Sequence, residues 1–112
     1  MLSLNEGRYF ANLTSEPVLS KTTDGSDVVN FRVAINAAGK GQVVEPTTFV
    51  DVEAFGGLAR LCSLKITIGS LIFLQAKLKS VDWDGGTKSK LYLRADNIQF
   101  LDFLKNDYAG KN

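Results

Sequence analysis

The stretch Thr48-Phe-Val-Asp-Val-Glu-Ala-Phe-Gly-Gly-Leu-Ala59 joins a period-two pattern to a pair of glycines, and this junction decides the fold. The alternation predicts a β-strand over residues 47–55, because neighbouring residues of a strand point to opposite faces. One face would carry Val50, Val52 and Ala54, and the other would carry Phe49, Asp51, Glu53 and Phe55. The glycines end the strand, and one short helix is predicted before Gly69. The residues at helical spacing are Leu58, Leu61, Cys62 and Lys65.

Two strands are predicted on the N-terminal side of this junction. Residues 28–36 alternate clearly, with Phe31, Val33 and Ile35 directed inward. An earlier and less regular segment runs over residues 7–19, and its candidate core residues are Tyr9, Phe10, Leu13, Val18 and Leu19. A Thr-Asp-Gly-Ser turn at residues 23–26 connects the two segments, and the glycines and proline of residues 37–46 predict a loop.

Two further strands are predicted after the helix. Residues 70–80 would bury Ile72, Leu74, Ala76 and Leu78. Residues 88–98 would direct Leu91, Leu93 and Ala95 inward. Three strands, a helix and two strands is the order of a five-stranded Greek-key barrel, the OB-fold. We therefore predict an all-β domain with one short helix over residues 1–104, and a short frayed end at residues 105–112.

Composition excludes several classes of protein. The 112 residues contain no histidine, which removes Ser-His and Cys-His nucleophile pairs, imidazole catalysis and Cys/His zinc sites. We expect a binding module rather than an enzyme, with no catalytic residue, no cofactor and no metal; Asp82-Trp-Asp-Gly-Gly86 lacks the later ligands of a calcium loop. No apolar run approaches the ~20 residues of a membrane helix. The start lacks signal-peptide features and there is one cysteine, so the expected location is the cytosol, without a membrane partner.

A hairpin predicted between Lys77 and Arg94 carries Trp83 near its tip and cations along both strands. Its five basic residues outnumber two acidic ones, whereas residues 41–59 hold three carboxylates and no basic residue. The formal charge of the whole chain is only +1, but a lopsided field can steer a polyanion to one face. A flat ring for stacking, with charges nearby for phosphates, suits unpaired nucleotides. Single-stranded nucleic acid is therefore the predicted ligand.

The candidate contacts extend beyond the hairpin tip. Tyr92 shares a face with Arg94, which suits base stacking and phosphate pairing together. The candidate phosphate contacts are Lys77, Lys79, Lys88, Arg94, Arg32 and Lys21. Plainer alternatives exist for the same residues. Trp83 could cap the barrel or pack in an interface between subunits, and the lysines could simply keep an exposed strand edge soluble.

Four segments resemble the bacterial-type single-stranded DNA-binding proteins. Asn12-Leu-Thr-Ser-Glu-Pro17 is similar to the family's Gly-Asn-Leu-x-x-Asp-Pro segment, with alanine before it and glutamate at the aspartate. Asp24-Gly25, followed by Val29-Asn-Phe-Arg-Val-Ala34, is similar to its second strand. The stretch from Thr48 to Ala59 resembles its most recognisable part, and residues 69–78 with Trp83 resemble the fourth strand and the hairpin tryptophan. The four segments occur in order, over residues 7–101.

The resemblance implies an OB-fold that stacks DNA bases on aromatic side chains. The matching positions are Phe49, Phe55 and Trp83. A further aromatic expected in the loop after the second strand is absent, and Gly39 lies near its place. Because strand aromatics are more often core residues than binding residues, a core position is the alternative for the two phenylalanines.

Asp51 and Glu53 depart from this picture, because carboxylates on the stacking face would repel a phosphate backbone. We expect them to pair with Lys77 and Lys79. The carboxylates, the small net charge and the absent aromatic also support an alternative function, an OB-fold primosome-type protein-interaction adaptor with weak nucleic-acid binding. Salt dependence separates the two, because a strand-coating protein loses affinity with a log–log slope near −0.7 per phosphate neutralised. A metal-dependent nuclease built on the two carboxylates is the third class considered.

The resemblance also implies partners. Family members assemble into tetramers from dimers, so we expect a homo-oligomer with Leu2, Leu4, Tyr9 and Phe73 as candidate contacts. Cellular members carry an acidic-tipped tail that recruits replication or recombination proteins. No such tail precedes Asn112, as expected for a phage or mobile-element member, a shortened chain or a tail-less primosomal relative. The implied function is sequence-independent single-stranded DNA binding that protects unpaired strands in replication, recombination or repair.

Overall fold

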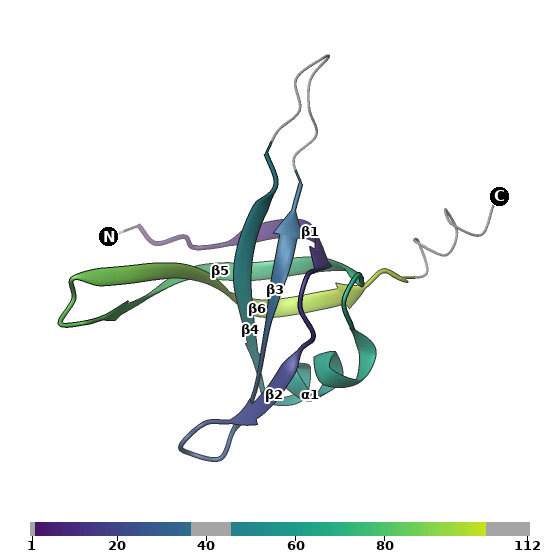
Figure 1. Cartoon of the computed structure of the whole chain (residues 1–112), viewed down its shortest axis with the longest axis horizontal. Helices are drawn as coiled ribbons and strands as arrows, with labels where there is room; N and C mark the ends of the chain where they lie inside the picture. Colours follow the sequence, from purple (N-terminus) through teal and green to yellow (C-terminus); the bar gives the residue numbers. More distant parts are fainter. Residues whose placement is uncertain (1, 37–45, 103–112) are drawn as a thin grey trace.

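The computed structural model describes residues 2–36 and 46–102. In this part of the chain the elements are β1 (Gly7–Leu13), β2 (Val18–Lys21), β3 (Asp27–Ile35), β4 (Thr48–Phe55), α1 (Gly56–Lys65), β5 (Leu71–Trp83) and β6 (Lys88–Phe100) (Figure 1). The strands form one sheet in the order β1-β5-β6-β4-β3-β2, and a further pairing of β1 with β3 closes it. The described residues therefore confirm an all-β fold with one short helix. The closed sheet of five strands agrees with the OB-fold, and β2 is an added strand beside β3.

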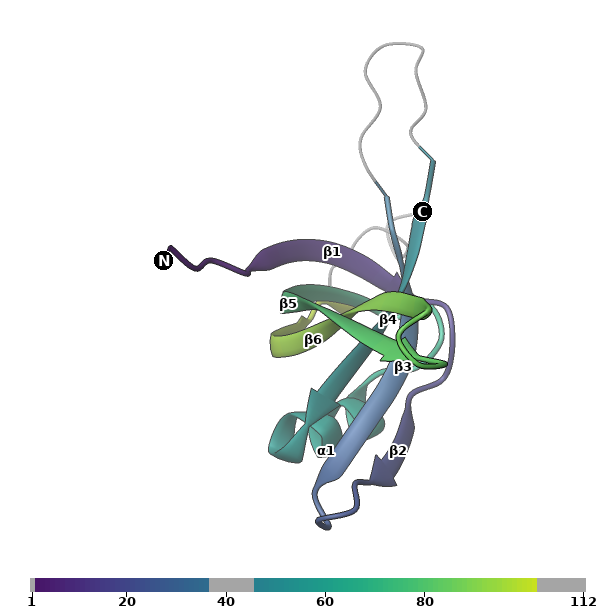
Figure 2. The ribbon, with the colours of Figure 1, turned by 90° about the vertical axis from the view of Figure 1, so that its left-hand side faces the viewer.

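The core lies inside this closed sheet and is built from the alternate residues of its strands. Val52 and Ala54 of β4 are fully buried, as the alternation predicted, and the same holds for Ile72 and Leu74 of β5. Helix α1 lies at one end of the sheet, close to β2 and β3 (Figures 1 and 2), and contributes Ala59 and Cys62 to the core. Burial raises the pKa of the Cys62 thiol to about 11.

Antiparallel pairing joins every neighbouring pair of described strands except β4 and β6, which run parallel. In that pair Val52 lies opposite Leu93, and Glu53 lies opposite Arg94. The outward side chains of β4 are therefore next to the outward side chains of β6. This adjacency positions the candidate site.

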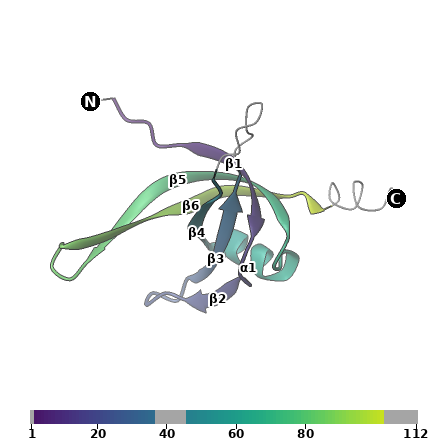
Figure 3. The same cartoon turned by 45° about the horizontal axis from the view of Figure 1, so that its top comes forward.

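Strands β5 and β6 continue past the closed sheet as a two-stranded ribbon, which we call the hairpin arm (Lys77–Arg94). It reaches away from the barrel on the left of Figures 1 and 3. Its strands stay in register from Lys77 opposite Arg94 to Trp83 opposite Lys88, beyond an irregularity at Gln75/Ala76. Asp84, Gly85 and Gly86 all have positive φ at the tip. Glycine adopts this conformation without strain, so the predicted turn forms readily.

Several predicted core residues lie on the surface instead. Leu78 and Leu91 follow the inward alternation but are 48% and 60% exposed, because the hairpin arm extends beyond the barrel that would cover them. Phe10 is 65% exposed, since Tyr9 and Ala11 are the residues of β1 that face the core. Val18 and Leu19 are also exposed, because β2 is an edge strand outside the closure. The other inward assignments on β3, β4 and β5 are confirmed.

Candidate nucleic-acid interface

One continuous surface gathers most of the predicted site residues, and we call it the open face. Cross-strand partners share a face of a sheet, so the register of the hairpin arm places its aromatic and basic side chains together, and the β4–β6 and β3–β4 pairings extend this face across the barrel. Its members are Asn30 and Arg32 of β3, Phe49, Asp51, Glu53 and Phe55 of β4, Lys77, Lys79, Val81 and Trp83 of β5, and Lys88, Lys90, Tyr92 and Arg94 of β6.

The predicted stacking residues point outward rather than into the core. Phe49 is 53% exposed, Phe55 is 37% exposed and Trp83 is 46% exposed. The structure thus excludes a core position for the two phenylalanines and a barrel-capping position for Trp83. Tyr92 is half-buried beside Glu53, and its burial, together with this carboxylate, raises the pKa of the phenol. Aromatic rings are therefore available along the whole open face, from β4 to the tip of the arm.

The carboxylates of β4 already hold cations of the open face. Asp51 Oδ1 accepts a hydrogen bond from Arg32 Nη1 at 2.9 Å, and Asp51 Oδ2 pairs with Lys90. Glu53 Oε1 accepts hydrogen bonds from both Nε and Nη2 of Arg94 at 3.1 Å. The hydrogen bond from Lys90, assisted by Arg32, lowers the pKa of Asp51 despite partial burial. Asp51 is therefore ionised at neutral pH.

The expected pairing of these carboxylates with Lys77 and Lys79 is wrong. Lys77 Nζ instead contacts Asp96 at 2.9 Å, and it lines a separate hollow beside Leu4 and Glu6. The physical reason is the sheet order: β4 neighbours β6 rather than β5, so cations of β6 reach the β4 carboxylates first. The sequence predicted a basic hairpin and a separate acidic stretch. In the fold, β4 lies beside β6 of the hairpin, so carboxylates of β4 pair with cations of the hairpin.

Two lysines of the hairpin arm have no carboxylate partner among the described residues. Lys79 lies opposite Tyr92, and Lys88 lies opposite Trp83. Neither takes part in an ion pair within residues 2–36 and 46–102. The uncompensated positive charge of the open face is therefore concentrated on the arm, next to aromatic rings.

Arg94 occupies one side of the Phe55 ring. Its guanidinium carbon lies 4.7 Å from the ring centroid, a cation–π contact. Because the same guanidinium is hydrogen-bonded to Glu53, Arg94 is held in place over the ring. A base approaching from this side would meet the guanidinium plane, which also stacks on bases.

Lys21 does not join the other site residues. Its Nζ contacts Asp27 Oδ1 at 2.7 Å, and Asp27 Oδ2 also pairs with Arg60 of α1 at 2.5 Å. These contacts, led by the hydrogen bond from Lys21, lower the pKa of Asp27. They tie β2 and β3 to the helix, so the structure gives Lys21 a fold-stabilising position. The absent aromatic near Gly39 lies outside the described residues.

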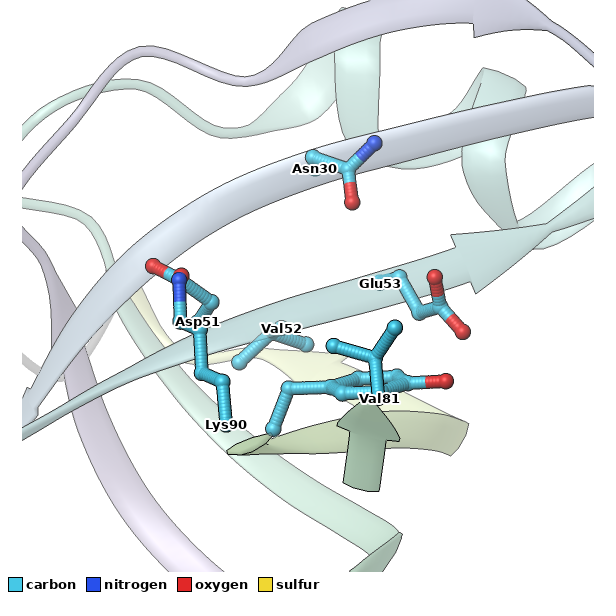
Figure 4. Close-up of a pocket in the computed structure, with 7 residues that line it drawn as sticks. Asn30, Asp51, Val52, Glu53, Val81 and Lys90 are labelled. Atoms are coloured by element: carbon cyan, nitrogen blue, oxygen red, sulfur yellow. The ribbon is translucent and has the colours of Figure 1, made fainter. Parts of the chain in front are cut away.

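Two adjoining hollows mark a path across the open face. The first has a volume of about 250 Å³ and lies between the arm and the barrel (Figure 4). It is lined by Asn30, Asp51, Val52, Glu53, Val81, Lys90 and Tyr92. The second, about 390 Å³, continues over β3 toward Ser15 and Val18 and shares Asn30 and Asp51 with the first. Sequence reasoning missed Asn30 and Val81, although their alternation with Arg32 and with Trp83 would have placed them on this face.

The described residues hold no group of three or more His, Cys, Asp or Glu arranged for a metal ion. Within residues 2–36 and 46–102, the helix is too short to cross a membrane.

Comparison with known proteins places this chain in a family. The model of the single-strand binding protein family matches residues 4–101. A single-stranded DNA-binding protein of Aquifex aeolicus is 29% identical over 103 residues, covering 88% of this chain and 70% of the relative. Single-stranded DNA-binding protein 1 of Xylella fastidiosa is 31% identical over 108 residues, covering 90% and 79%. Its Synechocystis counterpart is 28% identical over 104 residues, covering 89% and 85%. This chain therefore belongs to the single-strand binding protein family.

Proposed function

We propose that this protein binds single-stranded DNA without regard to sequence and protects unpaired strands during replication, recombination or repair. The observation that carries the proposal is the open face, where exposed aromatic rings and cations lie on one continuous surface. Binding by stacking and phosphate contact makes and breaks no covalent bond, so the proposed activity is not enzymatic. DNA is unwound in the bacterial cytosol, which is the proposed location.

Base stacking supplies the sequence-tolerant part of the affinity. Phe49, Phe55 and Trp83 are the proposed platforms, with Tyr92 between the arm and the barrel. Each base stacked on an aromatic side chain contributes about 1–3 kcal/mol, and every base has a face that can stack. The two adjoining hollows supply a route for the strand between β4 and the arm.

Phosphate contacts are proposed to fall into two groups. Lys79 and Lys88 can contact phosphates directly, because neither pairs with a carboxylate in the part of the chain that the structure describes. Arg32 and Arg94 must first exchange a carboxylate for a phosphate. Lys77 lies at the margin of the face, and Lys21 is proposed only as a secondary contact.

A homo-oligomer, dimer or tetramer, is proposed as the working form. Phe10 and Phe73 pack together on the outer side of β1 and β5, with ring centroids 5.2 Å apart. Leu2 and Leu4 are almost fully exposed nearby in sequence, so apolar surface is available for a second copy. Tyr9, an earlier candidate, packs against the core and is replaced by Phe10 in this proposal.

The first test is a titration of Trp83 fluorescence with an oligothymidylate at two salt concentrations. Because Trp83 is the single tryptophan of the chain, its emission reports the tip of the arm alone. We expect strong quenching that weakens with salt. Unchanged emission without a mobility shift would favour the primosome-type adaptor instead, an alternative that the single-stranded DNA-binding relatives do not support.

The Trp83→Ala variant is the companion measurement. It should weaken binding of a labelled oligothymidylate by about 1–3 kcal/mol per subunit. The melting temperature should stay unchanged, because the side chain is half exposed and lies outside the core. A large fall in melting temperature with little change in affinity would make Trp83 structural.

A further inference from the structure

The hollow between the hairpin arm and the barrel leads to an inference that rests on the proposed function and extends it to base preference. Figure 4 shows Asn30 of β3 facing Asp51, Glu53 and Val81 across this space. The lining also includes the Tyr92 ring. A concave site with apolar walls and a few polar groups is the usual form of a site for a small planar ligand.

The charges of the lining disfavour a phosphate in this hollow. Its lysine, Lys90, is already held by Asp51, which also holds Arg32, and its second carboxylate, Glu53, holds Arg94. A phosphate placed here would have to displace Asp51 or Glu53 from the cations that these carboxylates hold. A neutral base that presents N–H groups would instead meet acceptors, so the occupant favoured by these charges is a nucleobase.

Acceptor capacity remains in the hollow after the internal contacts are made. Both hydrogen bonds from Arg94 go to Glu53 Oε1 and the Tyr92 hydroxyl also interacts with this carboxylate, which offers about four lone-pair sites in all. The Glu53 side chain is only 18% exposed, so a hydrogen bond to it is less weakened by water than one at an open surface. Asn30 makes no side-chain hydrogen bond within the described residues, which leaves its amide free to act as donor or acceptor.

We propose that this hollow holds one base of the bound strand and prefers bases with an exocyclic amino group over thymine, with Glu53 as the main acceptor and Asp51 as the second. The amino group of cytosine donates to a carboxylate, whereas thymine presents a carbonyl oxygen at the same position. Facing Glu53, that oxygen would be repelled. The result is a base preference at one position within otherwise sequence-tolerant binding.

The test compares two affinities of the full chain, for end-labelled oligocytidylate and oligothymidylate of equal length, by anisotropy at one salt concentration and neutral pH. The informative number is the ratio of the two association constants. Glu53→Gln should lower the cytosine-to-thymine ratio by about three- to tenfold, the range expected for one partly exposed charged hydrogen bond. The same change frees Arg94 for phosphates, but that gain applies to both oligonucleotides and cancels in the ratio.

Lys79→Gln is the matched control, since it removes one proposed phosphate contact outside the hollow. It should weaken both oligonucleotides equally and leave the ratio unchanged. Asp51→Asn is the second variant, and it should lower the ratio by a smaller factor.

The outcomes separate this inference from the proposed function. Wild-type protein that binds both oligonucleotides, with a ratio unchanged in Glu53→Gln and Asp51→Asn, would overturn the base preference and leave strand binding intact. Wild-type protein that binds neither would overturn both. Should Glu53→Gln fail to fold, the ratio in Asp51→Asn decides the question.

Discussion

At the scale of single residues, Asp51 and Glu53 determine how much positive charge the open face offers. Asp51 holds Arg32 and Lys90, and Glu53 holds Arg94 over the Phe55 ring. Such surface pairs contribute little to stability, typically about 0–1 kcal/mol each. Their larger effect is on binding, because a phosphate must displace a carboxylate to reach these cations.

Asp51→Asn should therefore tighten binding of oligothymidylate and steepen its salt dependence. Releasing Arg32 and Lys90 should change the log–log slope by up to about 0.7 for each cation that then contacts a phosphate. Titrations at several salt concentrations measure the slope. Asp96→Asn is the matched control, because it releases only Lys77 at the margin of the face. Equal slopes in wild type and Asp51→Asn would mean that the two cations do not contact DNA.

Period-two alternation predicted which residues of β4 point outward, since that pattern is local. It could not predict the partners of Asp51 and Glu53. Those depend on the parallel pairing of β4 with β6, which joins residues about forty positions apart in the chain. The same limit applies to Lys21, because its partner Asp27, which also pairs with Arg60 of the helix, could not be predicted from the pattern.

At the scale of elements, the hairpin arm is the part of the sheet where the alternation of the sequence does not match the burial of the side chains. Alternation continues unbroken along the arm, and for this reason Leu78 and Leu91 were predicted to be buried. Sequence patterning gives the face of a strand but not the point at which the covering layer ends. The N-terminal segment contacts the arm at this point, because the Asn5 side chain accepts a hydrogen bond from the Leu78 N–H at 2.8 Å and donates one to its C=O at 2.7 Å.

The two glycines of the β4–α1 junction should respond in opposite ways to alanine. Gly56 has a φ of +65° with open space around its Cα, so Gly56→Ala should lower the free energy of unfolding by about 1–2 kcal/mol through backbone strain alone. Gly57 lies in α1 without a positive φ, so Gly57→Ala should raise it by up to about 1 kcal/mol. Urea denaturation measures both. A loss at Gly57 matching that at Gly56 would contradict this account.

At the scale of the whole molecule, ionised carboxylates connect separate parts of the fold. A hydrogen bond from Thr67 lowers the pKa of Glu16, and the Lys21 and Lys90 contacts do the same for Asp27 and Asp51. The fold class and the outward positions of Phe49, Phe55 and Trp83 were predictable from sequence, whereas β2 as a separate strand was not. The contacts of these carboxylates with distant parts of the same chain were not predictable, because they form only when the barrel is assembled.

Stability should therefore fall in acid. A carboxyl group with a lowered pKa in the folded state stabilises the fold fully above its unfolded pKa of about 4, and this contribution disappears as pH falls through the folded value. The urea midpoint should be constant from about pH 7 to pH 5 and should decline below about pH 4. Asp27→Asn should show a smaller decline than wild type. A midpoint that stays level to about pH 3 would exclude this linkage.

Cys62 is a natural probe of the opening of the fold. Sealed in the core with its thiol protonated at neutral pH, it can meet an alkylating reagent only when the barrel opens. Trp83 lies outside this core, at the tip of the arm. The chain thus carries two natural probes in separate places. Alkylation of Cys62, measured by mass spectrometry, would report the rate at which the fold opens, and the fluorescence of Trp83 would report occupancy of the open face.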